Sequence, residues 1–272
     1  MSKKKKTSQD KMVKRLKIVV IICILVLLIE GIYIGIKVYQ TEKNSVYVDT
    51  ISGALRTSDG YVVVGSSDFK RSKTQEFSPQ YEKAKLAKYS EDKKLVFESA
   101  YTKGYNSYFY DVSETDDGYV AVGAAAYNEE QVEEGATDGL LVVYDKNGNQ
   151  KATKTLQILG DTTFTKVETL DDGYLVIGQS ILENMVIGND PNGGGIMIKY
   201  DFDLNEVWRA NYGGSKSAIF NDFVIDGDSI YVVGKDATRY GVFIKYNQDG
   251  TREFVKNYQY TDTVGFSSIA KV

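Results

Sequence analysis

Two aspartates are the residues of this sequence best suited to catalysis. Asp111 and Asp222 each stand two residues after the aromatic residue that opens a repeated pattern. If the segments that carry them line one channel, the two carboxylates would converge across it, and a pair of carboxylates is what a glycoside hydrolase requires. The same side chains could instead be structural partners of Lys166 or of backbone amides. We expect the structural role and keep hydrolysis as the alternative.

A second candidate is a short run of oxygen ligands with the spacing of a calcium loop. Asp201, Asp203 and Asn205 match the first three ligand positions. The sixth position holds Glu206 where the loop requires glycine, and the twelfth holds Tyr212 where it requires glutamate. We therefore interpret the run as a hairpin turn, and we predict no metal and no other cofactor.

The composition removes several classes of chemistry. The chain has no histidine and one cysteine among 272 residues, which excludes histidine-dependent catalytic triads, the usual zinc sites and an intrachain disulfide. Charge is divided unevenly, because the first 17 residues hold eight basic residues and one acidic residue while the whole chain has a net charge of −4. The remaining residues therefore total −11, which argues against binding to nucleic acid.

The N-terminal segment is typical of a membrane anchor. An apolar run from Ile18 to Ile36, interrupted by Glu30, approaches the roughly 20 residues that a transmembrane helix needs. We predict a basic cytoplasmic tail at 1–17, a transmembrane signal-anchor helix at 18–37 and a linker at 38–46. By the positive-inside rule the rest of this single-pass protein would lie outside the cell membrane. A cleaved signal peptide is the alternative, although no small-x-small cleavage site follows the run.

Residues 47–272 repeat one pattern four times. Each copy has an apolar segment, a polar turn, and a second apolar segment that closes on Gly65, Gly123, Gly178 or Gly234. A further hairpin follows, whose first arm ends in Tyr89, Tyr144, Tyr200 or Tyr246. Asp-Gly and Asn-Gly between apolar runs are strong hairpin signals, because both central residues of such a turn take positive φ. Each unit is therefore predicted to form four antiparallel strands.

Four-stranded units at a nearly constant interval are typical of a β-propeller. A single sheet of this kind cannot bury both of its faces, so the blades must pack around an axis. We predict an all-β domain at 47–272, with units at about 47–103, 104–160, 161–214 and 215–260 and a partial unit at 261–272. A right-handed β-solenoid is the alternative, although its repeats are usually shorter.

The repeat also resembles a known family. The segment 196–201 (IMIKYD), followed by Val207-Trp208 and Tyr212-Gly213-Gly214, is similar to the seven-bladed-propeller-type repeats of secreted and surface proteins of bacteria. The segment 141–149 (LVVYDKNGN) carries the same resemblance. The likeness covers about 47–272 and implies a bacterial cell-surface propeller. It implies nothing about a ligand, because such repeats mark architecture.

The last residues repeat the opening segment of a unit. Phe266 and Ile269 have the spacing of Phe109 and Val112, so 266–272 is predicted to be the first strand of a fifth blade. Two interpretations stay open. The strand closes a four-bladed ring, or the chain is a shortened copy of a longer propeller protein.

Three connections between second and third strands are long, and they are expected on the face opposite the tight turns. They are 66–84, 124–139 and 179–194. Long loops on a rigid scaffold often carry binding residues, so we predict that this face binds the ligand. The residues expected there are Lys70, Arg71, Lys73, Glu129, Glu130, Glu133, Glu134, Asp190 and Asn192. The alternative is that these loops are solvated insertions without a ligand.

The function predicted from these patterns is that of a membrane-anchored, extracytoplasmic module that binds a protein or a glycan without catalysing a reaction. One alternative is a glycan-acting hydrolase that uses Asp111 and Asp222. The other is a shortened copy of a longer propeller.

Overall fold

The computed structural model describes residues 20, 30–31, 33, 45–46, 49–68, 71–72, 82–158, 160–181, 193–213, 218–236, 240–259 and 265–271. The chain divides into two compact units, Met1–Tyr47 with Lys70–Glu76 and Val48–Phe69 with Phe77–Val272. In the first unit β1 (Ser45–Val46) pairs antiparallel with β4 (Arg71–Ser72).

The predicted membrane anchor falls almost entirely outside the described residues. Val20, Glu30, Gly31 and Tyr33 are described and are helical. Of the helices seen in the described residues, none combines the length and the apolar character needed to cross a bilayer. The anchor at 18–37 therefore stays a prediction.

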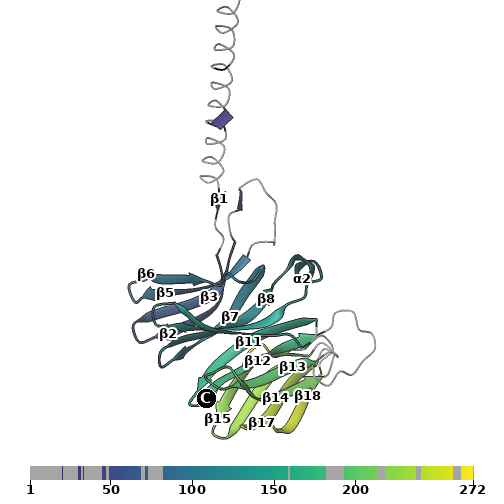
Figure 1. Cartoon of the computed structure of the whole chain (residues 1–272). Helices are drawn as coiled ribbons and strands as arrows, with labels where there is room; N and C mark the ends of the chain where they lie inside the picture. The colour runs from purple at the N-terminus through teal and green to yellow at the C-terminus, as the bar shows by residue number, and fades with distance from the viewer. Residues whose placement is uncertain are drawn as a thin grey trace, which may run out of the picture. The chain divides into compact units, whose positions relative to one another are not determined.

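The second unit contains four antiparallel four-stranded sheets, which we call blades 1 to 4 (Figure 1). Blade 1 consists of β2 (Asp49–Thr57), β3 (Gly60–Asp68), β5 (Glu82–Ser90) and β6 (Leu95–Ala100). Blade 2 consists of β7 (Asn106–Thr115), β8 (Gly118–Ala126), β9 (Asp138–Asp145) and β10 (Gln150–Leu156), with the short helix α2 (Glu129–Glu133) after β8. Blade 3 consists of β11 (Asp161–Leu170), β12 (Gly173–Ile181), β13 (Gly194–Tyr200) and β14 (Glu206–Gly213). Blade 4 consists of β15 (Ile219–Asp226), β16 (Ser229–Lys235), β17 (Gly241–Asn247) and β18 (Arg252–Tyr258). The predicted four strands per repeat are confirmed.

The first hairpin of blades 1 to 3 forms where predicted but for a different reason. The two turn residues in blade 1 are Ser58 and Asp59, and Gly60 is the first residue of β3, paired with Thr57. The expectation that an Asp-Gly pair supplies two central residues with positive φ is wrong here. Gly60 is needed because a Cβ built on it would lie 2.0 Å from the carbonyl oxygen of Tyr89 on the neighbouring strand.

The second hairpin of each blade does depend on a residue with positive φ. Gly148 and Gly250 have φ of 81° and 80°, and Lys93 and Leu204 occupy the equivalent places with φ of 61° and 63°. In all four turns the N–H of this residue donates to the carbonyl oxygen three positions earlier. The turn is therefore the same in every blade, although only two of the four sequences place glycine where it is least strained.

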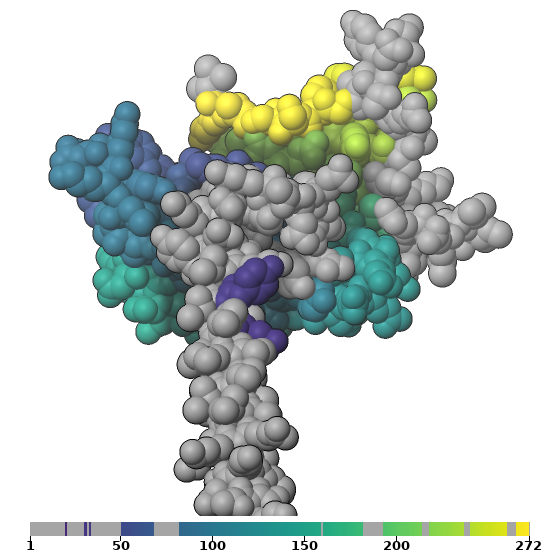
Figure 2. Space-filling view, turned by 90° about the horizontal axis from the view of Figure 1, so that it is seen from above, coloured from purple at the N-terminus to yellow at the C-terminus, as the bar shows by residue number. Residues whose placement is uncertain are grey.

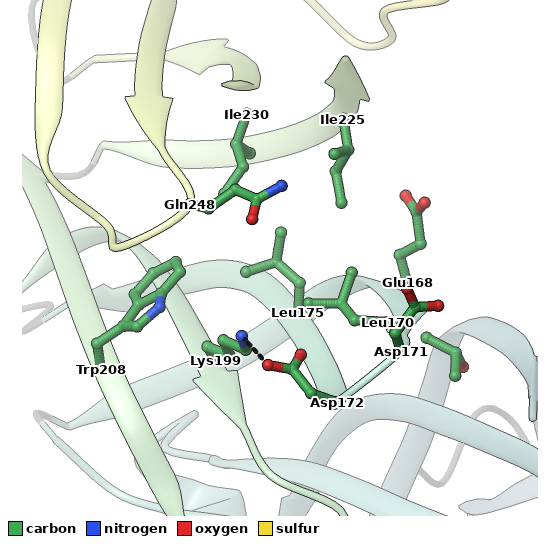
Figure 3. Close-up of a pocket in the computed structure, with 11 residues that line it drawn as sticks. Glu168, Leu170, Asp171, Asp172, Leu175, Lys199, Trp208, Ile225, Ile230 and Gln248 are labelled. Atoms are coloured by element: carbon green, nitrogen blue, oxygen red, sulfur yellow. Dashed lines mark hydrogen bonds and ion pairs between the residues drawn. The ribbon is translucent and has the colours of Figure 1, made fainter. Parts of the chain in front are cut away.

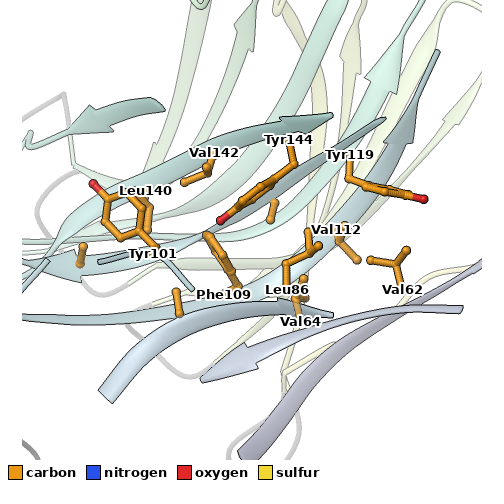
Figure 4. Close-up of a cluster of buried hydrophobic side chains, with 13 residues drawn as sticks. Val62, Val64, Leu86, Tyr101, Phe109, Val112, Tyr119, Leu140, Val142 and Tyr144 are labelled. Atoms are coloured by element: carbon orange, nitrogen blue, oxygen red, sulfur yellow. The ribbon is translucent and has the colours of Figure 1, made fainter. Parts of the chain in front are cut away.

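The core consists of three clusters, each between successive blades. Alternate residues of a strand face opposite blades, so Tyr119 and Ala121 of β8 pack toward blade 1, whereas Val120 and Val122 pack toward blade 3. In the first cluster the opening aromatic residue Phe109 of β7 is fully buried, and its ring meets that of Tyr144 edge-on at 6.2 Å (Figure 4). Burial of both faces of an inner sheet is what the propeller prediction required.

Blade 1 lacks this cover on one side. Phe109, Phe164 and Phe220 each open a blade that has a predecessor, and all three are 0% exposed. Ile51 holds the equivalent position in blade 1 and is 65% exposed. The burial of the opening residue therefore depends on the blade before it.

The segment 265–271 lies against blade 4 as the opening strand of a next blade would. Phe266 N donates to the carbonyl oxygen of Gly234, and the ring of Phe266 meets that of Tyr258 edge-on at 5.3 Å. In the space-filling view these residues, coloured yellow, form one edge of the second unit beside the green residues of blades 3 and 4 (Figure 2). No β-strand forms over 265–271, so the predicted first strand of a fifth blade is not observed there. The contacts of the segment, described below, nevertheless match those of an opening strand.

Candidate functional site

The first strand of each blade (β2, β7, β11 or β15) is called its inner strand. Three of the inner strands carry a charged residue at the same position, namely Asp111, Lys166 and Asp222. Each inner strand has a β-bulge just after its opening residue, between Phe109 and Asp111 in β7 and between Phe220 and Asp222 in β15. A bulge redirects the side chains beside it. The bulge thereby lets the aspartate reach the strand of the following blade.

Both predicted catalytic aspartates bond to the backbone of the following inner strand. Oδ2 of Asp111 accepts a hydrogen bond from the N–H of Val167 at 3.0 Å. Oδ2 of Asp222 accepts one from the N–H of Ile269 at 2.8 Å and another from the hydroxyl of Ser268 at 2.7 Å. The two bonds are equivalent, because Val167 and Ile269 each stand three residues after the opening phenylalanine of their segments.

The residue inside the bulge makes a second contact with the backbone of the following segment. The hydroxyl of Thr165 donates to the carbonyl oxygen of Phe220 at 2.8 Å, and the side-chain amide of Asn221 donates to that of Phe266 at 2.7 Å. The segment 265–271 thus meets blade 4 through both contacts, of which one joins blades 2 and 3 and the other joins blades 3 and 4. Asp111 and Asp222 act here as links between blades.

Lys166 lies between Asp111 and Asp222 in the sequence, and its positive charge acts on both carboxylates. Its ammonium group forms an ion pair with Oδ1 of Asp222, which is only 5% exposed. Burial alone would raise the pKa of Asp222, but the hydrogen bonds from Lys166, Ser268 and Ile269 together hold it below its usual value. Burial raises the pKa of Asp111, and the nearby charge of Asp222 adds to that rise.

The calcium-like run forms the hairpin turn between β13 and β14. Asp201 accepts hydrogen bonds from the backbone and side-chain amides of Asn205, at 2.7 and 2.9 Å. Within the described part of the chain, no group of three or more histidine, cysteine, aspartate or glutamate residues is placed to hold a metal ion. The carboxylate of Asp201 closes the turn.

The described part of the long-loop face offers few groups that converge on one point. Glu129, Glu130, Glu133 and Glu134 are exposed in or beside α2, whose N-cap Asn128 accepts from the N–H of Gln131 at 2.8 Å. The side chain of Arg71 and all of Lys70, Lys73, Asp190 and Asn192 lie outside the described residues. The prediction of a binding site on this face therefore stays a prediction.

Two cavities open on the opposite face, at the tight turns. The blade 2–3 groove has a volume of about 1150 Å³ and is lined by Glu114, Thr115, Asp116, Asp117, Val143, Tyr144, Asp145, Lys146, Lys151, Thr169, Leu170, Asp171, Tyr174 and Phe202. The blade 3–4 pocket has a volume of about 390 Å³ and is lined by Glu168, Thr169, Leu170, Asp171, Asp172, Leu175, Lys199, Trp208, Ile225, Ile230 and Gln248. Thr169, Leu170 and Asp171 line both.

The blade 3–4 pocket combines an apolar floor with a polar rim (Figure 3). Leu170 and Leu175 lie between Trp208 on one side and Glu168 on the other, with Ile225 and Ile230 beyond them. A cavity with apolar walls and a few convergent polar groups is the usual form of a small ligand site. The sequence contains one tryptophan, and it is this residue.

The charged groups of the pocket differ in how they are used. Lys199 donates to Asp172 at 2.7 Å, and Lys88 pairs with Asp59 at the same distance and at the equivalent position of blade 1. This ion pair is thus part of the repeat. Glu168 and Asp171 have no hydrogen-bond or ion-pair partner among the described residues. Burial raises the pKa of Glu168, and the charges of Asp111 and Asp222 raise it further against the opposing charge of Lys166.

Sequence reasoning did not predict this pocket. Its lining comes from six strands of two blades and from two turns, so no local motif marks it. One signal pointed toward it. Trp208 stands where blade 2 has Ala152.

No protein-family model and no curated protein matches the sequence. Among solved structures, the parainfluenza virus 5 hemagglutinin-neuraminidase with the ligand DANA superimposes with a TM-score of 0.51 at 8% identity, over 82% of this chain and 63% of that one. A second structure of the same viral protein gives a TM-score of 0.49 at 7% identity, over 82% and 62%. A GH43_1 enzyme from Xanthomonas citri gives 0.41 at 9% identity, over 79% and 78%.

The chain thus spans about 63% of the length of the viral protein that it resembles in fold. At 8% identity, that likeness concerns the fold alone. With the four sheets and the cores between them, it identifies the second unit as an all-β, propeller-type repeat structure.

Proposed function

We propose that this protein is a non-enzymatic binding module that receives its ligand in the blade 3–4 pocket. The observation that carries the proposal is the coincidence in one cavity of an apolar floor, the single tryptophan and the carboxylates of Glu168 and Asp171, which have no hydrogen-bond or ion-pair partner in the described part of the chain. A rigid scaffold surrounds the cavity on both sides, because its walls belong to adjacent blades that share a core.

The geometry of the inner strands supports a role without catalysis. Asp222 uses both carboxylate oxygens in bonds to Lys166, Ser268 and Ile269. Oδ2 of Asp111 is bonded to the backbone of Val167. A carboxylate that holds two strands together is not available to attack a substrate or to exchange a proton with it without loss of those bonds.

Ligand binding can be tested with the full chain, because Trp208 is its single tryptophan and lines the pocket. Glycans and peptides would be titrated while the emission of Trp208 is recorded. We expect a saturable change for a true ligand, and we expect Gln248→Arg to abolish it, because Gln248 lies at the pocket and arginine would place a cation inside it. Gln150→Arg, on the exposed edge of blade 2, is the matched control and should bind normally. If no compound of either class alters the emission, the proposal fails.

A second candidate function is glycoside hydrolysis by Asp111 and Asp222. It is favoured by their pKa values, which are shifted in opposite directions, as those of an acid and its partner carboxylate are in such enzymes. A protein of similar fold is named a hemagglutinin-neuraminidase. The candidate requires that the full chain release sugar from a chromogenic glycoside and that Asp111→Asn abolish the release. No turnover, or turnover unchanged by the substitution, would remove it.

We further propose that the segment 18–37 anchors the module in the cell membrane with the propeller outside. The support is the apolar run behind a strongly basic tail. In a bacterial host the protein should stay in the membrane fraction after alkaline washing, and protease added to spheroplasts should digest the propeller. Recovery in the soluble fraction would contradict the anchor, and protection from protease would contradict the orientation.

A further inference from the structure

We infer that the blade 3–4 pocket takes the side chain of an arginine or lysine from a basic segment of a partner protein. The inference rests on the proposed function and names its ligand class. It follows from three properties of the cavity, namely its shape, its charge and its position next to the blade 2–3 groove.

The shape of the pocket suits a long side chain with a polar end. Its floor is apolar, and Leu175 and Ile230 are 0% and 3% exposed. Figure 3 places Leu170 and Leu175 between Trp208 and Glu168, so an aliphatic stem along the floor would have the indole on one side and a carboxylate on the other. Arginine and lysine bury such stems on apolar surfaces while their charged ends meet polar groups. The indole ring is also the best aromatic partner for a cation.

The charge of the pocket favours a cation over a neutral or anionic ligand. Three carboxylates line it against one ammonium group, and that ammonium group, Lys199, is already bonded to Asp172 at 2.7 Å. Glu168 and Asp171 remain, with no ion-pair partner among the described residues. A cation that enters the pocket would supply the missing partner, whereas a carboxylate or phosphate would be repelled.

The blade 2–3 groove extends the site to the size of a peptide. It shares Thr169, Leu170 and Asp171 with the pocket, so the two cavities are neighbours on either side of the end of β11. Asp116 and Asp117 of the groove also have no hydrogen-bond or ion-pair partner within the described residues, and its volume is about 1150 Å³. A single small amine would leave this groove empty, but a peptide with further basic residues would fill both cavities.

The test compares two peptides that differ in one charge. Acetyl-Gly-Gly-Arg-Gly-Gly-amide and its analogue with citrulline in place of arginine would each be titrated into the full chain, with the emission of Trp208 as the signal. Citrulline has nearly the shape of arginine but no charge. We expect the arginine peptide to bind about tenfold more tightly, because only it forms charge-assisted hydrogen bonds with the carboxylates. Affinity should fall steeply with added salt.

Variants then distinguish binding of the peptide in the pocket from a general electrostatic attraction of the peptide to an acidic protein. Glu168→Gln and Asp171→Asn should each weaken the arginine peptide severalfold. Asp228→Asn, in the exposed turn after β15, removes the same charge outside the pocket and should leave the affinity unchanged. Circular dichroism melts of each variant would show that the fold is intact.

The outcomes distinguish this inference from the proposed function. Equal binding of the two peptides, or equal weakening by Asp228→Asn, overturns the cationic ligand. If a neutral glycan from the earlier screen changes the emission of Trp208 in the wild type but not in Gln248→Arg, the pocket binds a neutral ligand. The proposed function then holds and the inference of a cationic ligand is wrong. If nothing changes that emission, both the inference and the proposed function fail.

Discussion

The second hairpin turn of each blade contains one residue with positive φ, and the type of that residue affects the stability of the protein. A non-glycine residue in the left-handed region costs about 1–2 kcal/mol. Leu204 bears this cost while it packs, 6% exposed, in the core between blades 2 and 3. Lys93 bears it on an exposed turn with no such burial.

Lys93→Gly should therefore stabilise the protein. The relief of backbone strain is partly offset by the greater freedom of glycine in the unfolded chain, which leaves a gain of up to about 1 kcal/mol. Urea unfolding followed by tryptophan emission would measure it. A lower midpoint in the variant would show that the strain at φ 61° is unimportant.

Gly148→Ala should destabilise the protein by roughly 2–4 kcal/mol, the sum of backbone strain and overpacking. Gly148 has φ of 81°, and its Cβ would lie 2.4 Å from the ring of Phe97. Gly227→Ala is the control, because Gly227 has φ of 56° but nothing within 4 Å of the added atom. It should cost only the backbone strain, about 1 kcal/mol. Equal losses in the two variants would contradict the clash with Phe97.

Substitution of Asp111 and of Asp222 by asparagine should change the free energy of unfolding in opposite directions. The folded-state pKa of Asp222 is depressed, so its stabilisation is present above the unfolded pKa and is lost as the pH falls through the folded value. The folded-state pKa of Asp111 is raised, so stability is lost as the pH rises from the unfolded pKa to the folded value, and the full penalty is present above it.

At pH 7, Asp222→Asn should therefore lower the free energy of unfolding by about 2 kcal/mol, because it removes a buried charge-assisted bond. Asp111→Asn keeps an oxygen that can accept from Val167 and should stabilise the protein. Each difference should shrink as the pH falls below both the folded and the unfolded pKa of that aspartate, because the wild-type carboxylate is then protonated in both states. The measurement is the chemical unfolding midpoint over a series of pH values from 7 downward. Destabilisation at pH 7 by both substitutions would contradict the assignment for Asp111.

At the scale of elements, blades are joined through their inner strands by a contact that the sequence encodes twice. Exchange of the amide hydrogens of Val167 and Ile269 reports on it, because each N–H donates to an aspartate of the preceding blade. We expect both amides to be protected in nuclear magnetic resonance experiments. Asp111→Ala should expose Val167 alone, and Asp222→Ala should expose Ile269 alone. Loss of protection at both sites in either variant would mean that the contacts are not local.

The elements were largely predictable from the sequence, whereas their partners were not. The glycine-terminated strand pairs and the tyrosines before the second turns placed all four sheets. The position of Asp111 two residues after Phe109 was visible, but the bulge between them was not, and the bulge is what lets the carboxylate reach Val167. The expectation that the aspartates are structural partners of Lys166 or of backbone amides, with catalysis as the alternative, agrees with the bonds observed.

The same limit applies to the candidate site. Trp208 lies in β14 and Asp171 in the turn after β11, both in blade 3, and Gln248 belongs to blade 4, so their approach depends on how two sheets pack. No spacing in the chain records that approach. Long loops, by contrast, are visible in any sequence, which is why the opposite face attracted the prediction.

At the scale of the whole molecule, the two ends of the blade series differ. Ile51 is exposed because no described blade precedes it, whereas Val233 of blade 4 is 4% exposed beside the segment 265–271. Stability in such a series is approximately a sum of terms for single repeats and for neighbouring pairs. Substitutions in blades 1 and 4 should therefore be nearly additive, because the two share no core cluster.

The four strands of each of blades 2 to 4 are also one unbroken stretch of the sequence, and the opening strand docks on the blade made just before it. In blade 1 only β4 of the first unit comes between the strands. During synthesis the ribosome releases the N-terminal blade first, so every completed sheet can serve as the template on which the next one settles. No blade has to wait for a strand encoded far away. A ribosome that stalls between two blades would hold a shorter series of finished sheets, in which the newest one alone would still lack its cover.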